Sequence, residues 1–157
     1  MMRAYQVYAD TAVFGGVLDE EFQEASRAFF DGVGRGRFVL VSSAVVDREL
    51  KGAPEKVKEF YESMLPKTEI VDVSAEALEL EQAYLAAGIL ASESAMDALH
   101  VALATVGHAD LIVSWNFKHI VHFDKIRQFN AVNRLHGWPT LEIYSPKEVI
   151  SYEDENL

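Results

Sequence analysis

The chain has 157 residues, of which half are hydrophobic and 11% aromatic. This length and composition predict one folded domain with a substantial core and exclude a disordered chain. The 25 acidic and 14 basic residues give a formal net charge of −11, which argues against general binding of nucleic acid, because phosphate affinity comes mainly from Lys and Arg. The lack of cysteine excludes disulfides, thiolate metal sites and cysteine nucleophiles.

Neither a membrane segment nor a secretion signal is expected. No apolar run reaches the ~18 residues that a spanning helix needs, and the first residues, Met1–Gln6, lack the apolar segment of a signal peptide. We therefore expect a cytoplasmic protein. We assign residues 1–151 to a single domain and the acidic residues 152–157 to a frayed tail.

Short apolar runs and longer periodic segments alternate along the chain. The short runs predict strands of the length found in buried parallel sheets: Tyr5–Tyr8, Phe38–Val41, Ile70–Val73, Leu111–Val113 and Leu141–Ile143. Between them, apolar residues recur at helical spacing within Phe22–Phe29, Val57–Met64, Ala77–Ala87, Ala98–Val106 and Ile126–Val132. The alternation implies right-handed βα units and so a three-layer αβα sandwich, with a central, mainly parallel sheet of about five strands.

Acidic side chains stand near the carboxyl ends of these strands, where open α/β sheets place their active sites. Asp10 follows the first strand, Glu49 lies on the helix after the second, and Asp97 opens the helix that leads into the fourth. Each acid also has a structural interpretation. Asp10 could cap the helix that follows it, and Glu49 could be a solvated acid on the surface of its helix. Asp97 could be the acid of a capping box whose first residue is Ser94.

The combination of the three acids favours a catalytic role over the separate structural interpretations. Three carboxylates that converge repel one another unless a divalent cation lies between them. Oxygen ligands of this kind suit Mg²⁺ or Mn²⁺, which also hold a phosphate. Such a cation polarises a phosphodiester and helps to form a hydroxide nucleophile. It would also offset the negative charge of the protein where a nucleic acid must approach.

Four segments in sequence order carry a family pattern: Ala9–Thr11, Ser43–Leu50, Asp97–Ala104 and Val113–Phe117. Together they resemble the PIN domain, and most closely the VapC-type toxins of bacterial toxin–antitoxin operons. The third segment is the most specific, and the resemblance covers nearly the whole chain. It implies a PIN-like αβα fold, a ribonuclease that depends on Mg²⁺ or Mn²⁺, a cognate antitoxin and a homodimer.

The resemblance also assigns roles to residues. Metal binding and the activation of water for RNA cleavage fall to Asp10, Glu49 and Asp97. The side chains expected to support them are Thr11, Ser94 and Ser114. The fourth segment of the family usually reads Thr or Ser, any residue, then Asp. Here Ser114 matches, but Asn116 stands in place of the Asp. We include Asn116 among the expected catalytic residues, although its amide adds no charge.

Two other function classes stay open. The first is a PIN fold with weakened catalysis that works as a binding module, which Asn116 and the net charge of −11 favour and the three carboxylates oppose. The second is a phospho-acceptor receiver domain, which also has acids at strand ends. It needs a paired acid before the acceptor and a Lys after the last strand, and the placement here fits poorly.

The histidines offer weaker signals. His119 and His122, three residues apart, would bind zinc with His108 or Asp110, but no strong motif supports such a site, and a structural role is expected. His100 follows Asp97 by three residues and could donate near the site. A hydrogen-bonded core histidine is the favoured interpretation.

Overall fold

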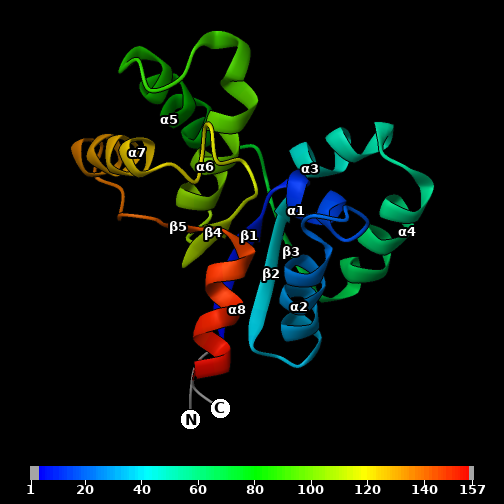
Figure 1. Cartoon of the computed structure of the whole chain (residues 1–157). Helices are drawn as coiled ribbons and strands as arrows, with labels where there is room; N and C mark the ends of the chain where they lie inside the picture. The colour runs from blue at the N-terminus through cyan, green and yellow to red at the C-terminus, as the bar shows by residue number, and fades with distance from the viewer. Residues whose placement is uncertain (1–3, 156–157) are drawn as a thin grey trace.

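The structure, a computed structural model, describes residues 4–155, in which strands and helices alternate (Figure 1). The strands are β1 (Tyr5–Ala9), β2 (Phe38–Ser43), β3 (Thr68–Val71), β4 (Leu111–Val113) and β5 (Glu142–Tyr144). The α-helices are α1 (Thr11–Gly16), α2 (Gln23–Gly34), α3 (Ala44–Glu49), α4 (Glu55–Met64), α5 (Ala75–Ala86), α6 (Ala95–Val106), α7 (Phe123–Leu135) and α8 (Pro146–Glu155). Short 3₁₀ helices are η1 (Leu50–Gly52), η2 (Leu65–Lys67) and η3 (Ser92–Ser94). Within residues 4–155, no helix has both the length and the apolar character to cross a membrane.

The strands form one parallel sheet in the order β3-β2-β1-β4-β5. From β1 the chain winds outward through β2 to β3, and then crosses back to β4, beside β1, before it reaches β5. The carboxyl ends of β1 and β4 therefore meet at the switch point of the winding, where open α/β sheets bind ligands. The expected parallel sheet is confirmed. The order also argues against a receiver domain, whose strands run 2-1-3-4-5.

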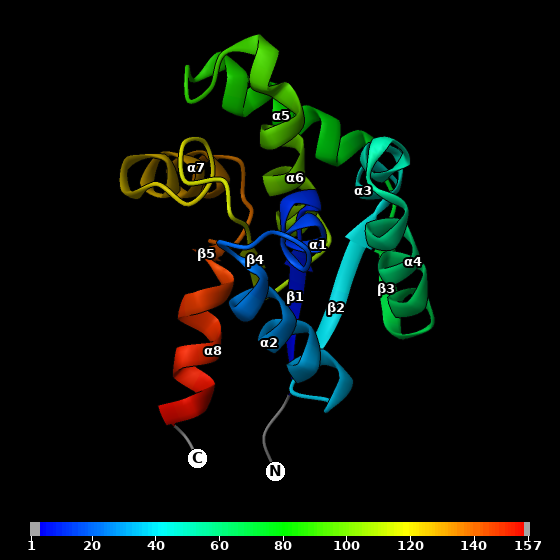
Figure 2. The ribbon, with the colours of Figure 1, turned by 45° about the vertical axis from the view of Figure 1, so that its right-hand side comes forward.

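Helices flank the sheet in two groups, which confirms the αβα layers (Figures 1 and 2). Helix α2 packs against α1 and α8, whereas α5 packs against α6 and α7. Helix α6 lies deepest, since all residues from Ala98 to Thr105 are buried, as its nearly apolar sequence predicts. An acid in the first turn of α6 therefore lies at the edge of the core.

Strand β3 begins and ends two residues earlier than the sequence predicted, at Thr68–Val71 rather than Ile70–Val73. The Thr68 hydroxyl donates to the Met64 carbonyl (2.6 Å) and closes the turn before the strand. At the other end, Ser74 caps α5 through its side chain, which ends the extended segment. Polar contacts at both ends, rather than the apolar run itself, set the position of this strand.

Helix α8 is a helix that the sequence analysis did not predict. The backbone N–H of Ser145 donates to the Glu148 carboxylate (2.9 Å), and Pro146 occupies the first helical position, where proline is favoured. The helix packs against α2 and passes residue 151, the expected end of the domain. Residues 152–155 of the expected tail are thus helical, and residues 156 and 157 lie outside the described residues.

Helix α1 approaches α2 closely at Gly16. A Cβ there would overlap the Ser26 hydroxyl and lie 3.0 Å from Trp115 Nε1, whereas a Cβ at Gly15 would meet open space. We expect Gly16→Ala to lower the free energy of unfolding by about 1–3 kcal/mol through overpacking. Gly15→Ala is expected to be neutral or stabilising by up to about 1 kcal/mol, because Ala is the better helix former. Urea denaturation of both variants measures the difference, and equal effects would contradict the close approach.

Candidate active site

Asp10 follows β1 directly, at the switch point between β1 and β4. Its Oδ2 accepts a hydrogen bond from Ser114 Oγ (2.5 Å), which follows β4. Asp10 occupies the N-cap position of α1 without a well-formed capping hydrogen bond from its side chain, although the backbone N–H of Val13 in the first turn of α1 acts to lower its pKa. Its Oδ1 is buried and has no hydrogen-bond partner among the described residues.

The environment of Asp10 disfavours its charge. Burial raises the pKa of Asp10 from 3.8 to about 6, although His100 and the Ser114 hydrogen bond act in the opposite direction. The charge of Asp97 adds to the rise. A buried carboxylate with an unpartnered oxygen is costly to keep ionised, and a cation at that oxygen would relieve the cost. Asp10 Oδ1 is therefore the clearest local indication of a cation site.

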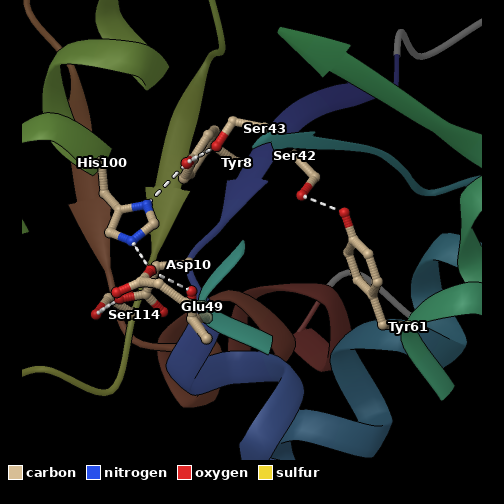
Figure 3. Close-up of polar contacts among 9 residues, drawn as sticks. Tyr8, Asp10, Ser42, Ser43, Glu49, Tyr61, His100 and Ser114 are labelled. Carbon is tan, nitrogen blue, oxygen red and sulfur yellow. Dashed lines mark hydrogen bonds and ion pairs between the residues drawn. The ribbon is translucent and has the colours of Figure 1, made fainter. Parts of the chain in front are cut away.

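Two donors from different elements hold Glu49, and both bind the same oxygen. Thr11 Oγ1 donates to Oε1 (2.6 Å), and His100 Nε2 lies 2.6 Å from it (Figure 3). Partial burial acts to raise the pKa of Glu49, but the hydrogen bonds from His100 and Thr11 outweigh it and hold the pKa below its usual value. Glu49 is therefore ionised at neutral pH, and its Oε2 keeps no partner among the described residues.

His100 links Glu49 to the core of the protein (Figure 3). Its Nδ1 lies 2.8 Å from the Tyr8 hydroxyl, which lies 2.8 Å from Ser43 Oγ. An ionised carboxylate only accepts, so Nε2 donates to Glu49. In the neutral ring Nδ1 then accepts from Tyr8, and Ser43 donates to Tyr8. The core interpretation of His100 is confirmed, and the same ring also orients a site carboxylate.

The hydroxyl of Tyr8 completes this chain, and its removal is expected to destabilise the fold. Tyr8→Phe leaves buried polar atoms of His100 and Ser43 without their partner, which costs about 1–3 kcal/mol of unfolding free energy. Tyr61→Phe is the matched control, because the Tyr61 hydroxyl has a single long contact, 3.4 Å to Ser42 Oγ (Figure 3). Urea denaturation should give the control less than about 1 kcal/mol. A loss in the control equal to that of Tyr8→Phe would contradict the assigned chain.

Asp97 lies in the first turn of α6 but does not form the expected capping box. Its Oδ2 pairs with His119 Nδ1 at 2.8 Å, and Ser94 makes no capping hydrogen bond. Because η3 runs directly into α6, Ser94 has φ −106° and ψ 20° instead of the extended backbone typical of a capping serine. The capping-box interpretation of Asp97 is wrong, and Ser94 takes part in no described hydrogen bond to the site carboxylates.

Asn116 organises the loop that follows β4. The side-chain Oδ1 of Asn116 accepts a hydrogen bond from the backbone N–H of His119 (2.9 Å). The backbone N–H of Asn116 donates to Ser114 Oγ (2.9 Å). The loop therefore connects Ser114, which holds Asp10, with His119, which holds Asp97. Asn116 supports the position of both acids through the loop, and its amide oxygen is used in doing so.

The three carboxylates share one feature that bears on metal binding. Each has one oxygen bound by a protein side chain and a second oxygen with no hydrogen-bond partner among the described residues. Donors of this kind orient carboxylates toward a metal, and hard oxygen ligands suit Mg²⁺ or Mn²⁺. Among the side chains described, however, no three His, Asp or Glu lie close enough together to hold a metal ion. The donor set fits a divalent cation chemically without forming a closed metal centre.

Tyr8 is a part of the site that the sequence analysis missed, and His100 and His119 take roles there other than those it favoured. Tyr8 stands two residues before Asp10, so the alternation of a strand sends both to the same face. His100 lies one helical turn from Asp97, a spacing that places both on one side of α6. His119 had been weighed as a zinc ligand, and it binds Asp97 instead.

The zinc alternative does not form in the described part of the chain. His122 is the N-cap residue of α7, and Asp110 Oδ2 accepts from the backbone N–H of Gln6 (2.8 Å). His119 is bound to Asp97, and the described residues contain no group of three His, Asp or Glu that could hold a metal ion. His108 takes a left-handed backbone, with φ 59°, in the turn before β4.

Comparison with known proteins gives a fold match. No protein-family model and no curated protein matches the chain. VapBC2 from Rickettsia felis, crystallised bound to a DNA fragment from its promoter, matches with a TM-score of 0.58 and 16% identity, over 88% of this chain and 96% of the matched chain. FitAcB from Neisseria gonorrhoeae matches with the same TM-score and identity, over 89% and 97%. The five-stranded parallel sheet and its flanking helices are therefore the PIN-like fold that the sequence segments predicted, shared with VapBC2 and FitAcB.

Proposed function

We propose that the chain is a divalent-metal-dependent ribonuclease and the toxin of a toxin–antitoxin pair. The observation that carries the proposal is that three acids, Asp10 after β1, Glu49 on α3 and Asp97 in the first turn of α6, each have one anchored oxygen and one oxygen without a hydrogen-bond partner among the described residues. The fold shared with VapBC2 and FitAcB supports it.

The protein groups divide the work of phosphodiester hydrolysis. A bound Mg²⁺ or Mn²⁺ supplies charge stabilisation to the phosphate and lowers the pKa of a coordinated water. Asp10, Glu49 and Asp97 would hold the cation through their free oxygens. His100 and Thr11 fix Glu49, Ser114 fixes Asp10, and His119 fixes Asp97. Fixed ligands reduce the rearrangement needed when the phosphate approaches.

The partners follow from the same proposal. The substrate is RNA, and a cognate antitoxin holds the enzyme inactive in the cytoplasm, where the chain forms a homodimer. With a net charge of −11, the chain attracts a basic partner by long-range electrostatics. Co-expression with the short reading frame next to its gene, followed by pull-down and light scattering, tests the antitoxin and the oligomer together.

The experiment that tests the activity is cleavage of a structured RNA by the purified protein. We expect cleavage with Mg²⁺ or Mn²⁺ and none in excess chelator, with activity restored when the cation is returned. The control is the same preparation with neither Mg²⁺ nor Mn²⁺ added. Cleavage that persists in chelator, or no cleavage with either cation, would contradict the proposal.

A second candidate is a PIN-fold binding module with weakened catalysis. It is favoured by Asn116, which brings an amide where the family carries an acid, and whose oxygen already accepts from His119. The absence of a grouped three-ligand site among the described residues points the same way. This candidate predicts RNA or protein binding without metal-dependent cleavage, so the same assay separates the two.

A further inference from the structure

A pocket of about 460 Å³ lies between α5 and the turn that follows α7, two helices packed together on one side of the sheet (Figure 1). Its volume is in the range of pockets that hold ligands. The residues that line it are Glu76, Glu79, Leu80, His136, Gly137 and Trp138. Neither Asp10, Glu49 nor Asp97 is among them, so the pocket is separate from the candidate active site.

The pocket lies at the other end of α6 from Asp97. The ring of Trp138 lies beside that of His108, with centroids 6.2 Å apart, and His108 is the second residue after α6. Asp97 is in the first turn of the same helix, which has 12 residues. A helix of this length is about 18 Å long, so a ligand in the pocket is remote from the candidate active site.

The turn after α7 holds Trp138 in place. The backbone N–H of Trp138 donates to the Asn133 carbonyl (2.8 Å), and that of Gly137 donates to the Arg134 carbonyl (3.1 Å), which is the pattern of a Schellman motif. Gly137 has φ 81°, a left-handed conformation that suits glycine. Trp138 is also half-buried. Its indole is therefore an ordered wall of the pocket, and little conformational freedom is lost when a ligand stacks on it.

The α5 side of the pocket carries two negative charges. Glu76 and Glu79 are three residues apart on α5, so both side chains lie on the same side of the helix. Neither forms an ion pair with another described residue. The helix dipole favours Glu76 in the first turn but not Glu79, one turn later. The lining contains no Lys or Arg, so these charges favour a cationic ligand.

Two carboxylates beside an indole match a planar organic cation. A guanidinium group presents its N–H donors in a fixed fork that fits carboxylates, and its flat face stacks on aromatic rings. Leu135 directly precedes His136 and is 81% exposed, which offers an apolar contact beside the pocket. A small free cation would leave that contact unused. The net charge of −11 attracts a basic protein segment by long-range electrostatics.

We propose that this pocket binds an arginine side chain from a basic protein segment. The guanidinium lies between Glu76 and Glu79 and stacks on Trp138, and an apolar neighbour of the arginine contacts Leu135. The pocket is thus a docking site for a partner, remote from the carboxylates of the candidate active site. This inference does not depend on the ribonuclease proposal.

The test uses the two tryptophans of the chain, Trp115 and Trp138. Their indole N–H groups give separate signals in a proton–nitrogen NMR spectrum, and Trp138→Phe assigns them. The probe is a short peptide in which leucine follows arginine, and its control carries citrulline, which has nearly the same shape without the charge. At low ionic strength the arginine peptide should shift the Trp138 signal and leave the Trp115 signal in place. The citrulline peptide should bind at least about 5-fold more weakly.

Variants of the two glutamates test the charge. Glu76→Gln combined with Glu79→Gln should lower the affinity for the arginine peptide by roughly 3- to 30-fold, followed through the Trp138 signal. The matched control combines Glu59→Gln with Glu62→Gln. It removes the same charge at the same spacing from exposed positions on α4, and should change the affinity by less than about 2-fold.

Several results would overturn the inference. They are equal binding of the arginine and citrulline peptides, equal losses in the two double variants, and a peptide that shifts the Trp115 signal alone or neither signal. Ethylguanidinium chloride is the small-molecule probe. If it binds as tightly as the arginine peptide, the assignment to a protein segment is overturned and the ligand is a small guanidinium compound.

Discussion

Asp97→Asn is expected to fold like the wild type and to lose at least about 100-fold of the metal-dependent cleavage rate, because metal stabilisation of the reaction is worth several kcal/mol. The side-chain oxygen of Asn can still accept from His119, so the contact at Oδ2 is preserved. The free carboxylate oxygen is replaced by an NH₂ group, which cannot bind a cation. Since Ser94 and Asp97 form no capping box, the change should cost little stability.

Asp124→Asn is the control for this variant. Asp124 also lies in the first turn of a helix, α7, and is exposed. Cleavage rates at saturating Mn²⁺, together with urea denaturation, measure both variants. Full activity in a folded Asp97→Asn protein would remove Asp97 from the catalytic site. Equal losses in the two variants would trace the effect to helix electrostatics.

The fold follows from the sequence wherever burial decides it. Strand β4 is buried throughout, so its apolar run Leu111–Val113 marks its bounds correctly. Strand β3 lies at the edge of the sheet and is partly exposed, so polar contacts at Thr68 and Ser74 decide where it starts and stops. The start of helix α8 is marked by the capping pattern Ser145–Glu148. The spacing of apolar residues does not mark it, so the sequence analysis did not predict this helix.

The site is predictable to the extent that it depends on strand ends. Asp10 lies where the rule for open sheets places it, because it directly follows β1. The partners of the acids are set by contacts between distant parts of the chain. Tyr8 and His100 are 92 residues apart, and Asp97 and His119 are 22 apart. No local pattern records these contacts, so the donors that anchor each carboxylate emerge only from the folded structure.

The pH dependence of stability should identify Asp10 without any assay of activity. Its pKa is 3.8 in an unfolded chain and about 6 in the fold, so the native state binds the proton more tightly. Asp10 is protonated in both states below pH 4, and there it imposes no charge penalty on the fold. As the pH rises through 6, Asp10 ionises in the folded state and the free energy of unfolding falls. At about 1.4 kcal/mol per pKa unit, the loss in chelator reaches roughly 3 kcal/mol above pH 7.

Asp10→Asn cannot titrate at this position, so its unfolding free energy should lack that decline. From pH 4 to pH 7, in chelator, the stability of the variant relative to wild type should rise by up to about 3 kcal/mol. Asp72→Asn is the matched control, because Asp72 also follows a strand directly, β3, but is exposed. Its curve should run parallel to that of the wild type. Parallel curves for Asp10→Asn as well would contradict the raised pKa.

Added cation should reverse the relation between Asp10→Asn and wild type at pH 7. A cation that binds only the folded state stabilises it by about 2.7 kcal/mol at a 100-fold excess over Kd, and the ionised Asp10 oxygen that burial penalises in chelator is the oxygen the cation would bind. Wild type and Asp72→Asn should therefore gain melting temperature with Mn²⁺, while Asp10→Asn gains little. Equal gains in all three proteins would place the cation elsewhere. No gain in any of them would favour the binding module, because the unpartnered Oδ1 would then be relieved by a proton rather than by a metal.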